Sequence, residues 1–69
     1  MDILAAKKSL YERLKSFGEV MGAGIKEKNG TEYIVIFLSN ATQSIIARIP
    51  KEYQGNKVET EIKGEIVTQ

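Results

Sequence analysis

The chain has 69 residues, which is enough for one small domain and too few for a second hydrophobic core. Hydrophobic residues make up 42% and charged residues 28%, values typical of a folded globular chain and not of a disordered segment. The formal net charge of +1 excludes the strong basic excess that nucleic-acid-binding proteins use. The absence of cysteine and histidine excludes disulfides, thiolate nucleophiles, imidazole bases and the common zinc sites. We expect a single domain over residues 1–69 that is not an enzyme and binds no metal or cofactor.

The N-terminal segment lacks the features of a secretory signal. Asp2 stands where such a signal carries positive charge, and the apolar run that follows is too short for its hydrophobic region. The longest apolar run is residues 34–38, whereas a helix that spans a membrane needs about 20 apolar residues. We therefore expect a cytoplasmic protein that does not enter a membrane.

Residues 3–17 have the apolar spacing of an amphipathic helix. Asp2 can cap its free N–H groups, and Gly18 stands where a left-handed residue would end it. The apolar stripe repeats every three or four residues and consists of Ile3, Ala6, Leu10, Leu14 and Phe17. The wet face consists of Lys7, Lys8, Glu12, Arg13 and Lys15.

A tight hairpin turn is predicted at Asn29 and Gly30, because both residues accept the positive φ angles of a type I′ turn. With a loop of these two residues, one face of the hairpin is wholly aliphatic. The helix stripe is expected to pack on this face. The pairs that form it are Ile25–Ile34, Ala23–Ile36 and Met21–Leu38.

This register has one unfavourable pair. Glu27 stands opposite Glu32, and like charges at that spacing repel mildly. A longer loop with a bulge near Lys28 is therefore an open alternative.

The other face of the hairpin carries Tyr33, Val35 and Phe37 opposite Gly22 and Gly24. Glycine weakens a strand, so two glycines in one strand suggest that something bulky crosses close to the backbone. We favour the chain's own Tyr33 and Phe37 rings over an outside partner. The three large side chains, Tyr33, Val35 and Phe37, are the candidate interaction face.

A short second helix is predicted over residues 41–49. Asn40 can cap it, and Pro50 forbids its continuation. Its isoleucines are mediocre helix formers, so packing is expected to hold it. These residues are Ile45, Ile46 and Ile49.

Residues 51–56 are expected to form a loop, with a turn at Gly55 and Asn56. Residues 57–63 then alternate between apolar or neutral side chains and charged ones, which predicts a strand with one wet face. Whether residues 65–69 extend the sheet is an open question at this point.

The predicted order is helix, strand, strand, short helix, strand. It indicates a two-layer α+β fold in which the N-terminal helix packs on a small, mostly antiparallel three-stranded sheet. A right-handed crossover makes the third strand parallel to the second. We place it beside the first strand, in the order 2-1-3, so that the strand with the glycines is central. The order 1-2-3 remains open.

The succession of motifs along residues 3–64 resembles a known small domain. The motifs are the helix, Gly22-Ala23-Gly24-Ile25, the turn, the apolar strand over residues 33–38 and the loop over residues 49–58. In this order they resemble the accessory domain found ahead of the protease domain in uncharacterised bacterial trypsin-like peptidases. One departure is Lys57, where that domain often has proline. The resemblance implies an accessory or interaction module without catalytic residues.

We expect a non-enzymatic protein-interaction or accessory module, with a homodimer as one version of it. Such a module acts by strand addition at a sheet edge or by burying the aromatic face. The alternative is a small nucleic-acid-binding protein that stacks bases on the sheet face. The charge pattern disfavours it, because residues 1–35 hold six basic and five acidic groups and residues 36–69 hold four of each.

Overall fold

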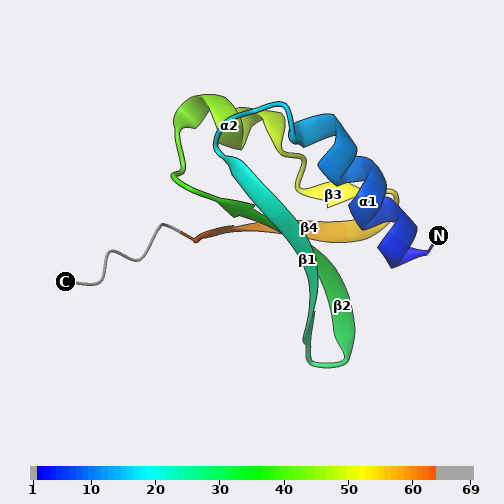
Figure 1. Cartoon of the computed structure of the whole chain (residues 1–69). Coiled ribbons are helices and arrows are strands. Elements are labelled where there is room, and N and C mark those ends of the chain that lie inside the picture. The colour runs from blue at the N-terminus through cyan, green and yellow to red at the C-terminus, as the bar shows by residue number, and fades with distance from the viewer. Residues whose placement is uncertain (1, 64–69) are drawn as a thin grey trace.

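The computed structural model describes residues 2–63 as one small two-layer α+β domain. Both helices lie on the same side of the sheet, and the tip of the first hairpin projects away from them (Figure 1). The predicted fold class is confirmed, with four strands in place of the predicted three. The open question of a strand over residues 65–69 lies outside the described residues. The elements are α1 (Ile3–Leu14), β1 (Val20–Lys28), β2 (Thr31–Leu38), α2 (Gln43–Arg48), β3 (Glu52–Tyr53) and β4 (Asn56–Ile62).

Helix α1 forms where the apolar stripe predicts it, but it ends earlier than expected. The Asp2 carboxylate accepts a hydrogen bond from the N–H of the helix's second residue, as predicted for the cap. The helix ends at Leu14, and Phe17 N–H then donates to the Leu14 carbonyl in a tighter turn. Gly18 does not have a positive φ, so its predicted left-handed role is wrong. The chain leaves the helix through the right-handed Lys15 instead.

The hairpin turn has the predicted geometry. Asn29 has a φ of 54° and Gly30 a φ of 80°, the two positive angles of a type I′ turn. The predicted register is confirmed from this turn to the pair Ala23–Ile36, with the two glutamates opposite each other. The alternative with a bulge near Lys28 is therefore wrong.

An irregularity lies at the other end of the hairpin. Val20, and not Met21, pairs with Leu38, so the predicted Met21–Leu38 pair is wrong. The extra residue shifts the pleat and allows Val20 to pack against the core, while Met21 is 52% exposed.

The sheet has the strand order β1-β2-β4-β3, in which β2 pairs antiparallel with β1 and parallel with β4. The predicted order 2-1-3 is wrong, the alternative 1-2-3 is correct for the three predicted strands, and the sheet is mixed. The reason lies in the two hairpin strands. Ile34, Val35 and Ile36 form a continuous buried run, which is typical of a central strand. Strand β1 has two glycines and a charged end, which suit an edge.

Helix α2 begins later than predicted. The hydroxyl of Thr42 accepts a hydrogen bond from Ile45 N–H at 3.3 Å, so Thr42 is the cap and the prediction for Asn40 is wrong. The helix ends before Pro50, as predicted.

The segment over residues 51–56 is not only a loop. It contains β3, which pairs antiparallel with β4 through a tight turn at Gln54 and Gly55. The predicted turn at Gly55 and Asn56 is one residue too late. A strand of two residues carries no periodic pattern, so nothing in the sequence predicts it.

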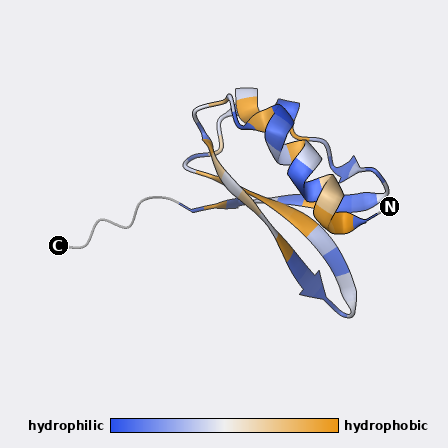
Figure 2. Cartoon of the chain, turned by 45° about the vertical axis from the view of Figure 1, so that its right-hand side comes forward, coloured by the Kyte–Doolittle hydropathy of each residue, from blue (hydrophilic) through white to orange (hydrophobic). Residues whose placement is uncertain are grey.

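The core lies between the helices and the helix-facing side of the sheet. Figure 2 colours the hydrophobic residues of both layers orange. Ile3 and Phe17 extend it at its rim. Ile62 is 55% exposed, so the apolar side of β4 is buried only at Val58. Ile46 of α2 is 42% exposed. The core residues are Ala6, Leu10, Leu14, Ile34, Ile36, Leu38, Ile45, Ile49 and Val58.

The second turn allows a test of the backbone geometry. Gln54 has a φ of 51°, a left-handed conformation that costs most residues about 1–2 kcal/mol and asparagine less. The substitution Gln54→Asn gives this turn the same residue pair as the first one. We expect the free energy of unfolding, measured by urea denaturation, to rise by about 0.5–1 kcal/mol. Asn29→Gln is the reciprocal control and is expected to lower it. A decrease for Gln54→Asn would contradict the turn.

Candidate functional site

The predicted interaction face of Tyr33, Val35 and Phe37 lies on the side of the sheet away from the helices. These side chains alternate with Ile34 and Ile36, which point into the core. Val35 is fully buried, while Tyr33 and Phe37 are half-buried. A partner can therefore touch the two aromatic rings but not Val35. The use of this face by a partner stays a prediction.

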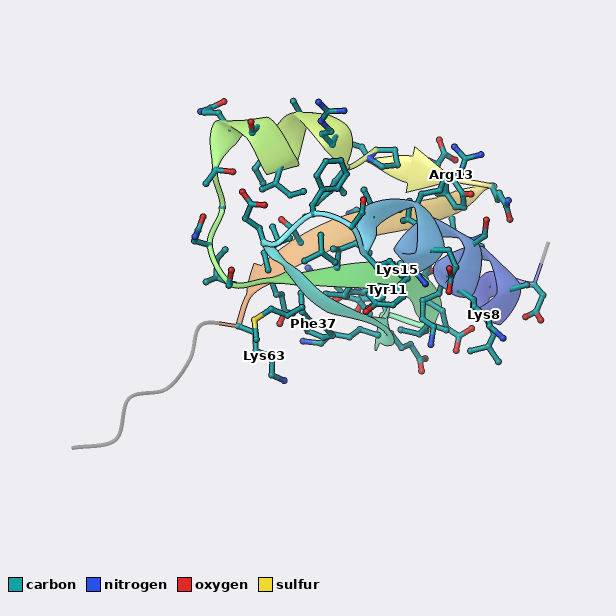
Figure 3. All side chains as sticks on the ribbon, turned by 45° about the horizontal axis from the view of Figure 1, so that its top comes forward. Lys8, Tyr11, Arg13, Lys15, Phe37 and Lys63 are labelled. Atoms are coloured by element: carbon teal, nitrogen blue, oxygen red, sulfur yellow. The ribbon has the colours of Figure 1, made fainter. Side chains whose placement is uncertain are left out.

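The Phe37 ring covers one of the two glycines of β1. A Cβ atom at Gly24 would lie 3.1 Å from Cε2 of Phe37, which confirms the preference for the chain's own ring at this position. No heavy atom lies within 4 Å of such a Cβ atom at Gly22, so contacts within the described residues do not explain the second glycine. The Lys63 ammonium lies 5.0 Å from the centre of the Phe37 ring, at one end of the sheet (Figure 3).

An ion pair crosses this face above the central strand. Lys26 on β1 and Glu61 on β4 flank β2 on either side, and their side chains bond to each other. In the sheet register Lys26 stands beside Tyr33 and Glu61 beside Phe37, so the pair passes at the level of Val35. The hydrogen bond from Lys26 to Glu61 raises the pKa of the Lys26 ammonium group. The apolar centre of the face is thus covered by the chain's own side chains.

The outer side of β1 is an open sheet edge. In an antiparallel ladder alternate residues bond to the partner strand, and the pair that flanks a two-residue turn is a bonded one. Here that pair is Lys28–Thr31, so the N–H and C=O groups of Ala23, Ile25 and Glu27 point away from β2. Within residues 2–63 no backbone hydrogen bond from another segment reaches these three residues.

A shallow groove runs beside this edge, between β1 and α1. Its volume is about 530 Å³, and Leu4, at 57% exposure, forms part of its wall. Lys8 and Tyr11 lie on the flank of α1 that faces the hairpin (Figure 3). None of the three ion pairs among the described residues includes Lys7 or Lys8. The groove is lined by Leu4, Lys7, Lys8, Tyr11 and Ala23.

A larger groove of about 820 Å³ lies on the other flank of α1, between α1, α2 and β3. Arg13 projects toward β3 on this side (Figure 3). The sequence predicts Lys7, Lys8 and Arg13 as members of a wet helix face and not as the lining of a groove. Neither groove can be predicted from the sequence, because both depend on how α1 sits over the sheet, which residue spacing along one helix does not reveal.

The acidic side chains of the described residues do not assemble into a metal-binding cluster. Within residues 2–63 no three acidic side chains gather as ligands for a metal ion, and no helix of this part is long and apolar enough to cross a bilayer. Comparisons of the chain with protein-family models, with curated proteins and with solved structures gave no match. The resemblance to the bacterial peptidase accessory domain therefore stays a prediction.

The two glycines of β1 form a matched pair for testing the sheet face. Alanine at either site reduces the conformational entropy of the unfolded chain, which stabilises by about 0.4–1 kcal/mol where the site has room. We expect this gain for Gly22→Ala. Gly24→Ala forces the Phe37 ring to shift, so its free energy of unfolding should be about 1 kcal/mol below that of Gly22→Ala. Urea denaturation measures both.

The control repeats both substitutions in a Phe37→Ala background. The difference between the two glycine variants should then disappear, because the ring that causes it is gone. A difference that persists without Phe37 would show that the ring does not cover Gly24.

Proposed function

We propose that this chain is a non-enzymatic protein-interaction module that binds an extended segment of a partner protein as an added strand beside β1. The observation that supports this function is the row of unbonded backbone groups at Ala23, Ile25 and Glu27. In strand addition the main-chain hydrogen bonds give affinity, and pockets for alternate side chains give specificity.

The groove beside the edge supplies such a pocket. Side chains of an added strand point alternately to the two faces of the sheet, so every second one meets the groove under α1. Leu4, Tyr11 and Ala23 contribute apolar surface to this groove. The ammonium groups of Lys7 and Lys8 favour an acidic residue next to the apolar one. The preferred segment is therefore extended, apolar at alternate positions and acidic near its centre.

The same charges disfavour a second copy of the chain at this edge. Pairing β1 with β1 around a two-fold axis would bring the α1 helices of the two copies alongside each other. Lys7 and Lys8 of each copy would then face the same residues of the other, and like charges repel. A homodimer remains an outcome that the experiment detects.

The nucleic-acid alternative is less well supported. Glu59 and Glu61 lie on the same sheet face as the Phe37 ring, where they would repel the phosphates of a nucleic acid stacked on it. Lys26, a cation of that face, is already paired with Glu61.

The test uses a proline that removes one outward donor. Proline is tolerated on an edge strand where the N–H faces solvent, so Ile25→Pro keeps the pairing with β2 and blocks an added strand. Ile25→Ala is the matched control, because it also loses the isoleucine side chain but keeps the N–H. The probes are eight-residue peptides that are selected from a phage-display library for binding to the unmodified chain. We expect Ile25→Pro to weaken their binding, measured by calorimetry, at least about tenfold more than Ile25→Ala does.

Two results would contradict the proposal. Selected peptides that bind Ile25→Pro as tightly as Ile25→Ala would show that the edge is not used. Sedimentation that reveals a dimer of the unmodified chain, abolished by Ile25→Pro and not by Ile25→Ala, would show that a second copy occupies the edge.

A further inference from the structure

A second groove lies on the flank of α1 away from β1. It is bounded by α1, by the turn that follows it, by α2 and by β3, and its volume is about 820 Å³. A groove of this size accommodates several side chains of a ligand. Its apolar walls include Leu14, Phe17, Pro50 and Tyr53.

The aromatic walls of this groove are held in place. The Tyr53 hydroxyl and the Ser9 hydroxyl are 2.8 Å apart and share a hydrogen bond, which ties β3 to α1. The Arg13 guanidinium lies 5.9 Å from the centre of the Tyr53 ring, and that of Arg48 lies 5.2 Å from the centre of the Phe17 ring. These contacts are within the range of cation–π attraction, so both arginines have a preferred position before any ligand arrives.

The charged side chains that line the groove are all cationic. Arg13 and Arg48 both line it, and neither forms an ion pair with a carboxylate of residues 2–63. A guanidinium held over a ring face still has N–H groups free, and these match the two oxygens of a carboxylate. Apolar walls with two such cations are complementary to a ligand that is apolar in its middle and acidic at its ends.

We propose that this groove binds an acidic segment of a partner protein, with a large apolar side chain between the two arginines and carboxylates on Arg13 and Arg48. Most of the residues that line the groove are apolar or aromatic, and the net charge of the chain is only +1, so the groove is poorly suited to a nucleic-acid backbone. This site is separate from the β1 edge. The strand-addition function can therefore fail while this proposal holds. This proposal can likewise fail while the strand-addition function holds.

The three tyrosines of the chain report separately on the three surfaces. Tyr53 lines this groove, Tyr11 lines the groove beside β1, and Tyr33 lies on the opposite sheet face. NMR signals of the three rings therefore show where a ligand binds. The probes are blocked peptides in which a central leucine, isoleucine, phenylalanine or tryptophan is flanked by two glutamates on each side. Matched peptides with glutamine in place of glutamate are the neutral controls.

We expect at least one acidic peptide to shift the signals of Tyr53 and Phe17 in a saturable way while those of Tyr11 and Tyr33 stay in place. Arg13→Gln and Arg48→Gln should each weaken this binding about tenfold or more, because each removes a charge-assisted hydrogen bond. Lys28→Gln makes the same change in net charge at the tip of the hairpin and should leave the affinity within about twofold.

Several results would overturn the proposal. These are the absence of saturable shifts at Tyr53 up to millimolar peptide, equal binding of the glutamine peptides, and equal weakening by Lys28→Gln.

Tighter binding of a single-stranded RNA oligonucleotide at Tyr53 would assign the groove to nucleic acid instead. Binding of free decanoate, weakened by the arginine substitutions where the peptides are not, would assign it to a small amphiphile. Shifts confined to Tyr11 would support the β1 edge and not this groove.

Discussion

The burial of β2 on both of its faces is the constraint on which the rest of the structure depends. Ile34, Ile36 and Leu38 are fully buried on the helix side, and Val35 is equally buried on the other side. A strand that is buried on both faces is typical of the centre of a sheet. Neighbouring strands cover its two edges, and side chains or helices cover its two faces. Strand β1 pairs with one edge of β2 and β4 pairs with the other, and α1 covers the apolar face of the sheet. The Phe37 ring and the ion pair between Lys26 and Glu61 cover the remaining face.

This arrangement also determines which surfaces are open. With β2 in the centre, β1 becomes an edge along its full length, while β3 shields β4 only at its start. Helix α1 lies over the sheet between these two sides and forms a groove along each flank. The groove beside β1 combines an open backbone edge with two lysines, and the groove beside α2 combines aromatic walls with two arginines. The proposed interactions are therefore consequences of where α1 rests on the sheet.

The elements that depend on local chemistry were predictable from the sequence. The stripe from Ala6 to Leu14, the turn at Asn29 and Gly30 and the break at Pro50 are each determined by residues close together in the chain. The strand order was not, because two glycines in β1 are compatible both with close packing in a central strand and with a weak edge strand. The continuous apolar run of β2 was the signal that could have placed it in the centre. The grooves combine residues from distant segments, such as Arg13 with Tyr53, so no local sequence pattern predicts them.

Amide hydrogen exchange, followed residue by residue by NMR, tests the central position of β2 most directly. Amides bonded between strands are protected, whereas amides that face solvent exchange rapidly. The amides of β2 should be the slowest of the sheet, and in β1 those of Gly24 and Lys26 should exchange far more slowly than those of Ala23 and Ile25. Equal protection of all four β1 amides, or rapid exchange through Ile34 to Ile36, would show that β1 is not an open edge beside a central β2.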